Sequence, residues 1–280
     1  MNQLYILIML FALSLPSPQK QEPNHCCSSR TTAFASLGND AQFRNAHEDP
    51  IPSNYIAMGR MITFPTPDGK TGRAYYVPAK KQTKNFIFVF HEWWGLNDWI
   101  KKEADMYADS VSTANVLALD LYDGNVAANE DDATKFMQAL DEARAKAIIK
   151  GALTYAGKDA GIATIGWCFG GGWSMQGALL GGPQTKGCVM YYGMPESDVN
   201  KLKSLNSDVI FFWAKKDQWI NEKVKNDFVS NMQAAGKKLE VHEYNADHAF
   251  ANPSNPHYDQ ASTADAQKLT MAYFRKVFGS

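Results

Sequence analysis

Cys168 stands in a glycine-rich sequence, Gly166-Trp-Cys-Phe-Gly170, between a short β-branched segment and small residues that can begin a helix. A strand, a sharp turn and a helix form the context of a nucleophile elbow, here with cysteine where serine is more usual. The two glycines leave room for the tight backbone, the helix N-terminus lowers a thiol pKa, and the next backbone N–H is free to bind an oxyanion. A buried structural cysteine in a turn is the alternative interpretation.

An acid and a histidine follow Cys168 along the chain. Asp217 follows the strand expected at 208–213, and His248 lies just past the end of the strand expected at 238–244, in Asn245-Ala-Asp-His-Ala-Phe250. Nucleophile, acid and histidine in this order match the triad of α/β-hydrolases. Asp217 alone also fits a solvated loop carboxylate, and Asp247 competes for the acid role, although adjacent residues seldom point at one another. The other histidines are set aside by their positions: His25 and His47 in a polar N-terminal arm, His91 before a turn, His242 and His257 away from strand ends.

Apolar segments alternate with helical patterns from about residue 58 to the C-terminus, which predicts an α/β fold with a mostly parallel sheet covered by helices on both faces. We expect strands at 59–64, 73–77 (joined to the first as a hairpin), 85–91, 115–121, 162–165, 187–192, 208–213 and 238–244. We expect helices after Asn97, at 132–140 and 142–156, from Cys168 to Gly181, and at 222–235 and 264–278. Functional groups should gather at the carboxyl ends of the strands.

Several separated motifs resemble, in order, those of the dienelactone hydrolase family over residues 58–280. They are His91-Glu-Trp-Trp-Gly-Leu-Asn97, Asp120-Leu-Tyr122, Gly166-Trp-Cys-Phe-Gly-Gly171, Tyr191-Tyr-Gly193, Lys216-Asp217 and Asp247-His-Ala-Phe250. The resemblance implies a single-domain α/β-hydrolase fold of about eight strands and a triad of Cys168, His248 and Asp217. It also implies that Glu92 helps to generate the thiolate, and that the backbone N–H groups of Trp93 and Phe169 form the oxyanion hole.

The sequence departs from the family at two positions. Members that open dienelactone hold its carboxylate with two arginines, where this chain has Gly124 and Asn252. Each lost charge-assisted hydrogen bond is worth about 1.5–3 kcal/mol. Aromatic residues near the strand ends favour a neutral, apolar or aromatic ester or lactone, although some should prove to be ordinary core. The expected pocket residues are Trp94, Tyr122, Trp167, Tyr192, Trp219 and Phe250.

Composition narrows the function classes. The chain has 280 residues and a formal net charge of −1 without a long basic run, which argues against nucleic acid as a partner. We interpret residues 1–20 as a secretory signal peptide that is too short to span a membrane, although no basic residue precedes its apolar run. Residues 21–55 are expected to form a polar arm or linker, and residues 56–280 the hydrolase domain. An exported location, periplasmic or extracellular, follows. No cofactor is expected, and no metal, because no His/Cys cluster has zinc-ligand spacing.

The leading hypothesis is therefore hydrolysis of a small ester or lactone through an acyl-enzyme intermediate. An amide or thioester substrate fits the same residues. A non-catalytic relative that binds an apolar ligand or partner at the cell envelope is the alternative from another class, and it would be favoured by a missing triad residue. Redox chemistry at Cys168 lacks a resolving cysteine. The natural substrate, the oligomeric state, the signal cleavage site and the role of Cys26 and Cys27 do not follow from the sequence.

Overall fold

An eight-stranded sheet with the order β1-β2-β4-β3-β5-β6-β7-β8 runs through the protein, in a computed structural model that describes residues 29–279. β1 and β2 form an antiparallel hairpin, β2 also pairs antiparallel with β4, and the other neighbours are parallel. The mostly parallel α/β sheet predicted from the sequence is thus confirmed. The strands are β1 Arg60–Pro65, β2 Thr71–Val77, β3 Asn85–Phe90, β4 Asn115–Leu119, β5 Gly161–Trp167, β6 Thr185–Tyr191, β7 Val209–Ala214 and β8 Leu239–Tyr244.

The inner strands are buried on both faces because their side chains are apolar without interruption. All residues of β4, β5 and β7 are buried, whereas the edge strands β1 and β8 alternate between more and less exposed residues. This is the pattern expected when helices cover a parallel sheet on both sides. Cys188 lies fully buried in β6.

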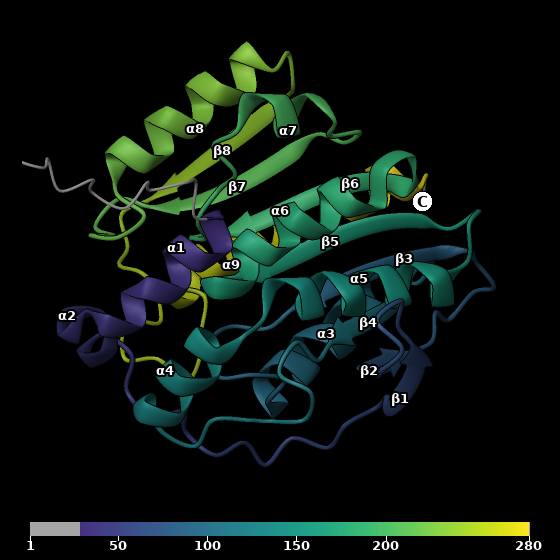
Figure 1. Ribbon diagram of the computed structural model, residues 1–280, viewed down its shortest axis with the longest axis horizontal. Helices are drawn as coiled ribbons and strands as arrows, with labels where there is room; N and C mark the ends of the chain where they lie inside the picture. The colour runs from purple at the N-terminus through teal and green to yellow at the C-terminus, as the bar shows by residue number, and fades with distance from the viewer. Residues whose placement is uncertain (1–28, 280) are drawn as a thin grey trace, which may run out of the picture.

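Helices cover the two faces of the sheet (Figure 1). α5, α6 and α8 lie on the face turned to the viewer, and α3 and α9 lie behind, where Gln267 of α9 donates to Glu103 of α3. The helices that follow the hairpin are α3 Asp98–Ser110, α4 Glu130–Ala139, α5 Glu142–Ala156, α6 Phe169–Gly181, α7 Val199–Lys203, α8 Glu222–Ala234 and α9 Gln260–Phe278, with a 3₁₀ turn at Gly182–Gln184. Asn97 caps α3 as expected, since its side chain accepts from Ile100 N. None of the helices within residues 29–279 is long and apolar enough to cross a bilayer.

Residues 30–47 differ from the arm or linker expected over 21–55. They fold into α1 Arg30–Ala35, a 3₁₀ turn at Ser36–Asn39 and α2 Ala41–Asn45, with Ser29 and Asp40 as N-caps. Phe34 and Phe43 from these helices are buried, so the segment packs on the hydrolase domain. We call residues 29–47 the N-terminal cap. The predicted signal peptide, His25 and the Cys26–Cys27 pair lie outside the described residues.

Candidate active site

Cys168 lies at the sharp turn between β5 and α6, where it is the N-cap residue of α6 with φ of 55°. A positive φ is strained for a residue with a side chain, and such strain concentrates at functional sites. The two flanking positions require glycine because any side chain there would clash with the backbone. A Cβ on Gly166 would lie 2.0 Å from the carbonyl oxygen of Gly170, and a Cβ on Gly170 would lie 2.3 Å from that of Phe90. The predicted nucleophile elbow is therefore present in the backbone.

Asp217 and His248 meet at the carboxyl ends of β7 and β8. His248 Nδ1 and Asp217 Oδ2 lie 2.6 Å apart, and both side chains are buried. Asp217 Oδ1 accepts from the backbone N–H groups of Trp219 and Ile220, each at 2.9 Å, which fixes the carboxylate. Because Asp217 is an acceptor, it holds the proton on Nδ1 and leaves Nε2 as a lone pair. That Nε2 has no hydrogen-bond partner among the described residues.

Glu92 enters the same site from the turn after β3. Asn252 Nδ2 donates to Glu92 Oε2, whereas Oε1 is buried and has no hydrogen-bond partner in the described part of the chain. Burial raises the pKa of Glu92 to about 8, and the hydrogen bond from Asn252 offsets part of this rise. At neutral pH the folded protein therefore favours a protonated Glu92.

The thiol of Cys168 is fully buried, which changes the expectation of a lowered pKa. Burial raises its pKa well above the usual range, and the neighbouring Glu92 carboxylate adds to the rise. The backbone N–H groups of Phe169 and Trp93 are directed at the sulfur and offset part of it. These are the two groups predicted to form an oxyanion hole. In the resting protein the sulfur is a thiol, and the groups that could ionise it surround it.

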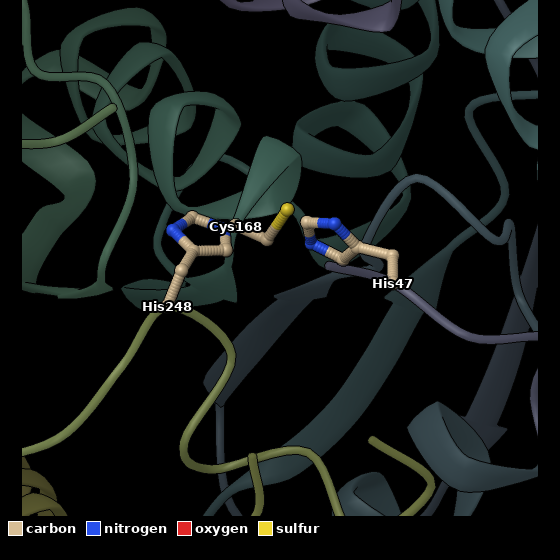
Figure 2. Close-up of side chains that lie close together, drawn as sticks. All are labelled: His47, Cys168 and His248. Carbon is tan, nitrogen blue, oxygen red and sulfur yellow. The ribbon is translucent and has the colours of Figure 1, made fainter. Parts of the chain in front are cut away.

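His47 is a site residue that sequence reasoning missed. It was set aside as part of the arm, but the N-terminal cap carries it into the site opposite His248, with Cys168 between the two rings (Figure 2). The sulfur and one ring nitrogen from each histidine all lie within 4.8 Å of one another. His47 Nδ1 is 2.6 Å from the carbonyl oxygen of Phe43, and its buried Nε2 has no hydrogen-bond partner within residues 29–279. Burial and the nearby His248 lower the pKa of His47 to about 3, so the ring is neutral at physiological pH.

The N-terminal cap closes the site from solvent. The ring of Phe43 lies 5.9 Å from that of His248 and 5.2 Å from that of Trp219, and Phe34 lies 6.4 Å from His248. Trp219 Nε1 donates to Asp40 Oδ2 at 2.9 Å, which ties the loop of Asp217 to the cap. Two buried aromatic residues followed by a histidine, in an otherwise polar stretch, were the signal in the sequence for this cover.

The six predicted pocket residues divide between the site and its supporting core. Tyr192 and Trp219 contact His248, with ring centroids 5.1 and 5.7 Å away, and Tyr122 lies 5.9 Å from Phe169. The other three pack mainly against aromatic residues, as ordinary core does. Trp94 packs against Trp93, Trp167 against Tyr191, and Phe250 against Tyr192 and Tyr244, all with tilted or edge-on rings.

The two positions that lack arginine are now explained in part. Asn252 is committed to Glu92 through Nδ2, and its Oδ1 accepts from Ser254 N and Oγ. Gly124 has φ of 102°, and a Cβ there would lie 3.1 Å from Arg73 Nη1. Arg73 comes from β2 and pairs with the carboxylate of Asp120 at 3.6 Å. The cation beside Gly124 is thus already paired with an acid.

The raised pKa of Glu92 predicts a pH-dependent cost to stability. Between about 4.5 and 8 the folded state holds a proton on Glu92 that the unfolded state releases, so this group's contribution to stability is full below 4.5 and is lost as the pH rises through 8. The slope is at most about 1.4 kcal/mol per pH unit. We expect Glu92→Gln to match the wild type in stability near pH 4.5 and to exceed it by a few kcal/mol at pH 8.

Urea unfolding of both proteins across this pH range measures the difference. Glu48→Gln, at an exposed carboxyl, is the matched control and should show no such trend. Because His47 and other groups titrate equally in both proteins, the difference isolates Glu92. A stability difference that does not grow with pH would contradict a buried, protonated Glu92.

Comparison with known proteins agrees with this geometry. Residues 73–278 match the dienelactone hydrolase family. "Protein usf" of Aquifex pyrophilus is 30% identical over 234 residues, which cover 78% of this chain and 99% of that protein. A putative carboxymethylenebutenolidase of Aquifex aeolicus is 28% identical, over 78% of this chain and 98% of its own length. The crystal structure of a putative dienelactone hydrolase from Klebsiella pneumoniae superposes with a TM-score of 0.69 at 22% identity, covering 79% of this chain and all of that one.

The sheet, the elbow and the order of the strand-end residues define an α/β-hydrolase. Within that class, the chain belongs to the dienelactone hydrolase family. It is therefore an enzyme of the carboxylic ester hydrolase kind. The N-terminal cap, including His47, precedes the matched residues 73–278.

Proposed function

We propose that this hydrolase cleaves its ester or lactone through the thiol of Cys168, with a covalent acyl-enzyme intermediate. The observation that carries the proposal is the Asp217–His248 hydrogen bond of 2.6 Å, which leaves a lone pair on Nε2 of a buried imidazole. One nitrogen of that ring lies within 4.8 Å of a thiol held at a nucleophile elbow. A nucleophile beside a base that a third group orients is the general signature of covalent catalysis.

The reaction follows from these positions. His248 Nε2 takes the proton of the thiol, and the sulfur attacks the carbonyl carbon. The oxyanion is bound by the backbone N–H groups of Trp93 and Phe169, and the imidazolium returns the proton to the leaving alcohol. A water molecule, deprotonated by the same Nε2, then attacks the thioester, and the carboxylic acid leaves as Cys168 regains its proton.

Glu92 assists the first step in this proposal. The thiol has a raised pKa at rest, so it needs a proton acceptor when substrate arrives. Glu92 Oε1 has no hydrogen-bond partner among the described residues, and its pKa is about 8. Its ionised fraction, the minority at neutral pH, can accept the thiol proton and so share this role with His248. A thiol that stays protonated until substrate binds is protected from alkylation and oxidation in the meantime.

We further propose a neutral substrate with an apolar or aromatic acyl group. Aromatic rings surround the site, and the expected carboxylate-binding arginines are absent at Gly124 and Asn252. Arg73, the cation near Gly124, pairs with Asp120. An anionic acyl group would thus lose its solvation without gaining an unpaired cation at either of these two positions. Since Cys168 is fully buried and the N-terminal cap packs against the site, we propose that the cap moves when substrate enters.

The proposal is tested with a matched pair of chromogenic esters, p-nitrophenyl butyrate and its carboxylate-bearing counterpart p-nitrophenyl succinate. We expect acid-quenched turnover mixtures to contain protein heavier by one butyryl group, on the peptide of Cys168. The neutral ester should have the higher kcat/KM by roughly tenfold or more, which corresponds to about 1.4 kcal/mol. An acyl group on another residue would overturn the mechanism, and preference for the succinate would overturn the substrate class alone.

A further inference from the structure

The thiol of Cys168 lies between two imidazole rings, those of His47 and His248, which are far apart in the sequence (Figure 2). Cys168 comes from the elbow, His248 from the loop after β8, and His47 from the N-terminal cap. The three potential ligand atoms lie within 4.8 Å of one another, and all three side chains are buried. Sequence spacing could not indicate this cluster because its members are 121 and 80 residues apart, from positions 47, 168 and 248.

The rings of His47 and His248 have the same tautomer. His47 Nδ1 is hydrogen-bonded to the carbonyl oxygen of Phe43, and His248 Nδ1 to the carboxylate of Asp217, so each ring carries its proton on Nδ1. Both Nε2 atoms are then acceptors, and both are buried without a partner among residues 29–279. One thiol has a single proton, so it can satisfy at most one of them. The other lone pair remains uncompensated in the resting protein, which is costly.

We propose that His47, Cys168 and His248 form a binding site for a zinc ion, with the thiolate and the two Nε2 atoms as ligands and a fourth position open. Imidazole and thiolate are the ligands that Zn²⁺ prefers, and the Nδ1 hydrogen bonds are the outer contacts that orient such histidines in zinc sites. Zn–S and Zn–N distances of about 2.3 and 2.0 Å place tetrahedral ligands about 3.3–3.6 Å apart. The present separations therefore need to close by at most about 1.5 Å.

Binding releases the proton of the Cys168 thiol to solvent and forms the Zn–S and two Zn–N bonds, with no change of oxidation state. The ion would occupy both the sulfur and His248 Nε2, and it would join the N-terminal cap to the body of the enzyme through His47. Zinc would then inhibit hydrolysis reversibly and hold the cap closed. The family match begins at residue 73, so His47 lies outside the part of the chain that matches the family, whereas Cys168 and His248 lie within it.

The test measures metal binding without substrate, and so it does not depend on the proposed reaction. The full chain carries Cys26→Ser and Cys27→Ser to remove the two thiols outside the described residues. Competition with a chromophoric chelator should give one Zn²⁺ per chain, and Co²⁺ should produce a thiolate-to-metal absorption band. His47→Asn should weaken zinc binding by at least about 100-fold, because it removes a ligand outright. Cys168→Ser should abolish the cobalt band.

Two further variants separate ligand loss from damage to the fold. His242→Asn removes a histidine of β8 that pairs with Glu240, and it should bind zinc as the parent does. His47→Cys restores a zinc ligand at the same position and should recover binding that His47→Asn loses. Zinc should also raise the melting temperature of the parent but not of His47→Asn. Equal zinc affinity in the parent and His47→Asn, or a cobalt spectrum without a thiolate band, would overturn the proposal.

Discussion

Replacement of Cys168 by alanine is expected to lower kcat/KM for a p-nitrophenyl ester on the order of 10⁴-fold or more, a loss of at least about 5 kcal/mol of transition-state stabilisation. The reason is that, in the proposed mechanism, the other groups of the site assist attack by the sulfur. Without the sulfur, no acyl-enzyme forms, and His248 and the N–H groups of Phe169 and Trp93 can assist only a direct attack of water on the ester. Initial rates at several ester concentrations measure the effect.

Cys188→Ala is the matched control for loss of a buried thiol. Cys188 lies in β6, 3.7 Å from Ser174 Oγ, and its side chain contributes to packing. This variant should lose some stability and keep its activity. If Cys168→Ala retained the wild-type rate, the thiol mechanism would be wrong, and the non-catalytic role of Cys168 as a structural residue would be favoured.

The positions of the inner strands along the chain could be predicted because these strands are continuous apolar runs. β3, β4 and β7 are recognisable from segments such as Asn85–Phe90, whose residues leave no polar face. Cys168, Asp217 and His248 were predicted because each follows a predicted strand, and parallel strands bring their carboxyl ends to one edge. Their mutual contacts needed the structure, which joined His248 to Asp217 rather than to its neighbour Asp247.

The N-terminal cap could not be predicted for a physical reason. α1 and α2 have six and five residues, too short for a helical period to stand out, and such helices are stable only through tertiary contacts. Those contacts are with residues that lie far along the chain, as between Asp40 and Trp219. α7, with five residues, was missed for the same reason. The role of Asn252 as a partner of Glu92 could not be predicted, because the hydrogen bond joins residues 160 positions apart. The sequence showed only that Asn252 stands where an arginine would be.

The N-terminal cap must satisfy two opposing requirements, exclusion of water and entry of the substrate. Cys168 is fully buried beside the cap. A closed cap would keep water from the site, which strengthens electrostatic interactions there, and it would also hinder entry of the substrate in the proposed reaction. The bonds that hold it are mostly single polar contacts, such as those from Arg30 to Pro195 O and from Asn255 to Ala46 O, together with the buried rings of Phe34 and Phe43. Opening therefore exposes apolar surface, and an apolar substrate that refills this space would offset the cost. The neutral substrate and the moving cap thus support each other as parts of one proposal.

Asp217→Asn is expected to lower kcat by about 10⁴-fold while the fold is preserved. Asparagine keeps an oxygen that can accept from Trp219 N and Ile220 N, as Asp217 Oδ1 does. Its amide group then replaces Oδ2 and donates toward His248 Nδ1. The proton of the neutral ring moves to Nε2, which faces the thiol as a donor and can no longer accept its proton. Steady-state kinetics should show the loss in kcat rather than in KM, because the changed group does not bind the ground state.

Asp247→Asn is the control for charge near the same histidine. Asp247 is adjacent to His248 in sequence, but it is half exposed and pairs with Lys216 at 4.0 Å. We expect this variant to keep kcat within about threefold of the wild type, since exposed ion pairs contribute at most about 1 kcal/mol. The reverse result, with Asp247→Asn inactive and Asp217→Asn active, would assign the acid role to Asp247. The difference between the two variants therefore measures orientation of His248 by a buried acceptor, separately from the general effect of a nearby negative charge.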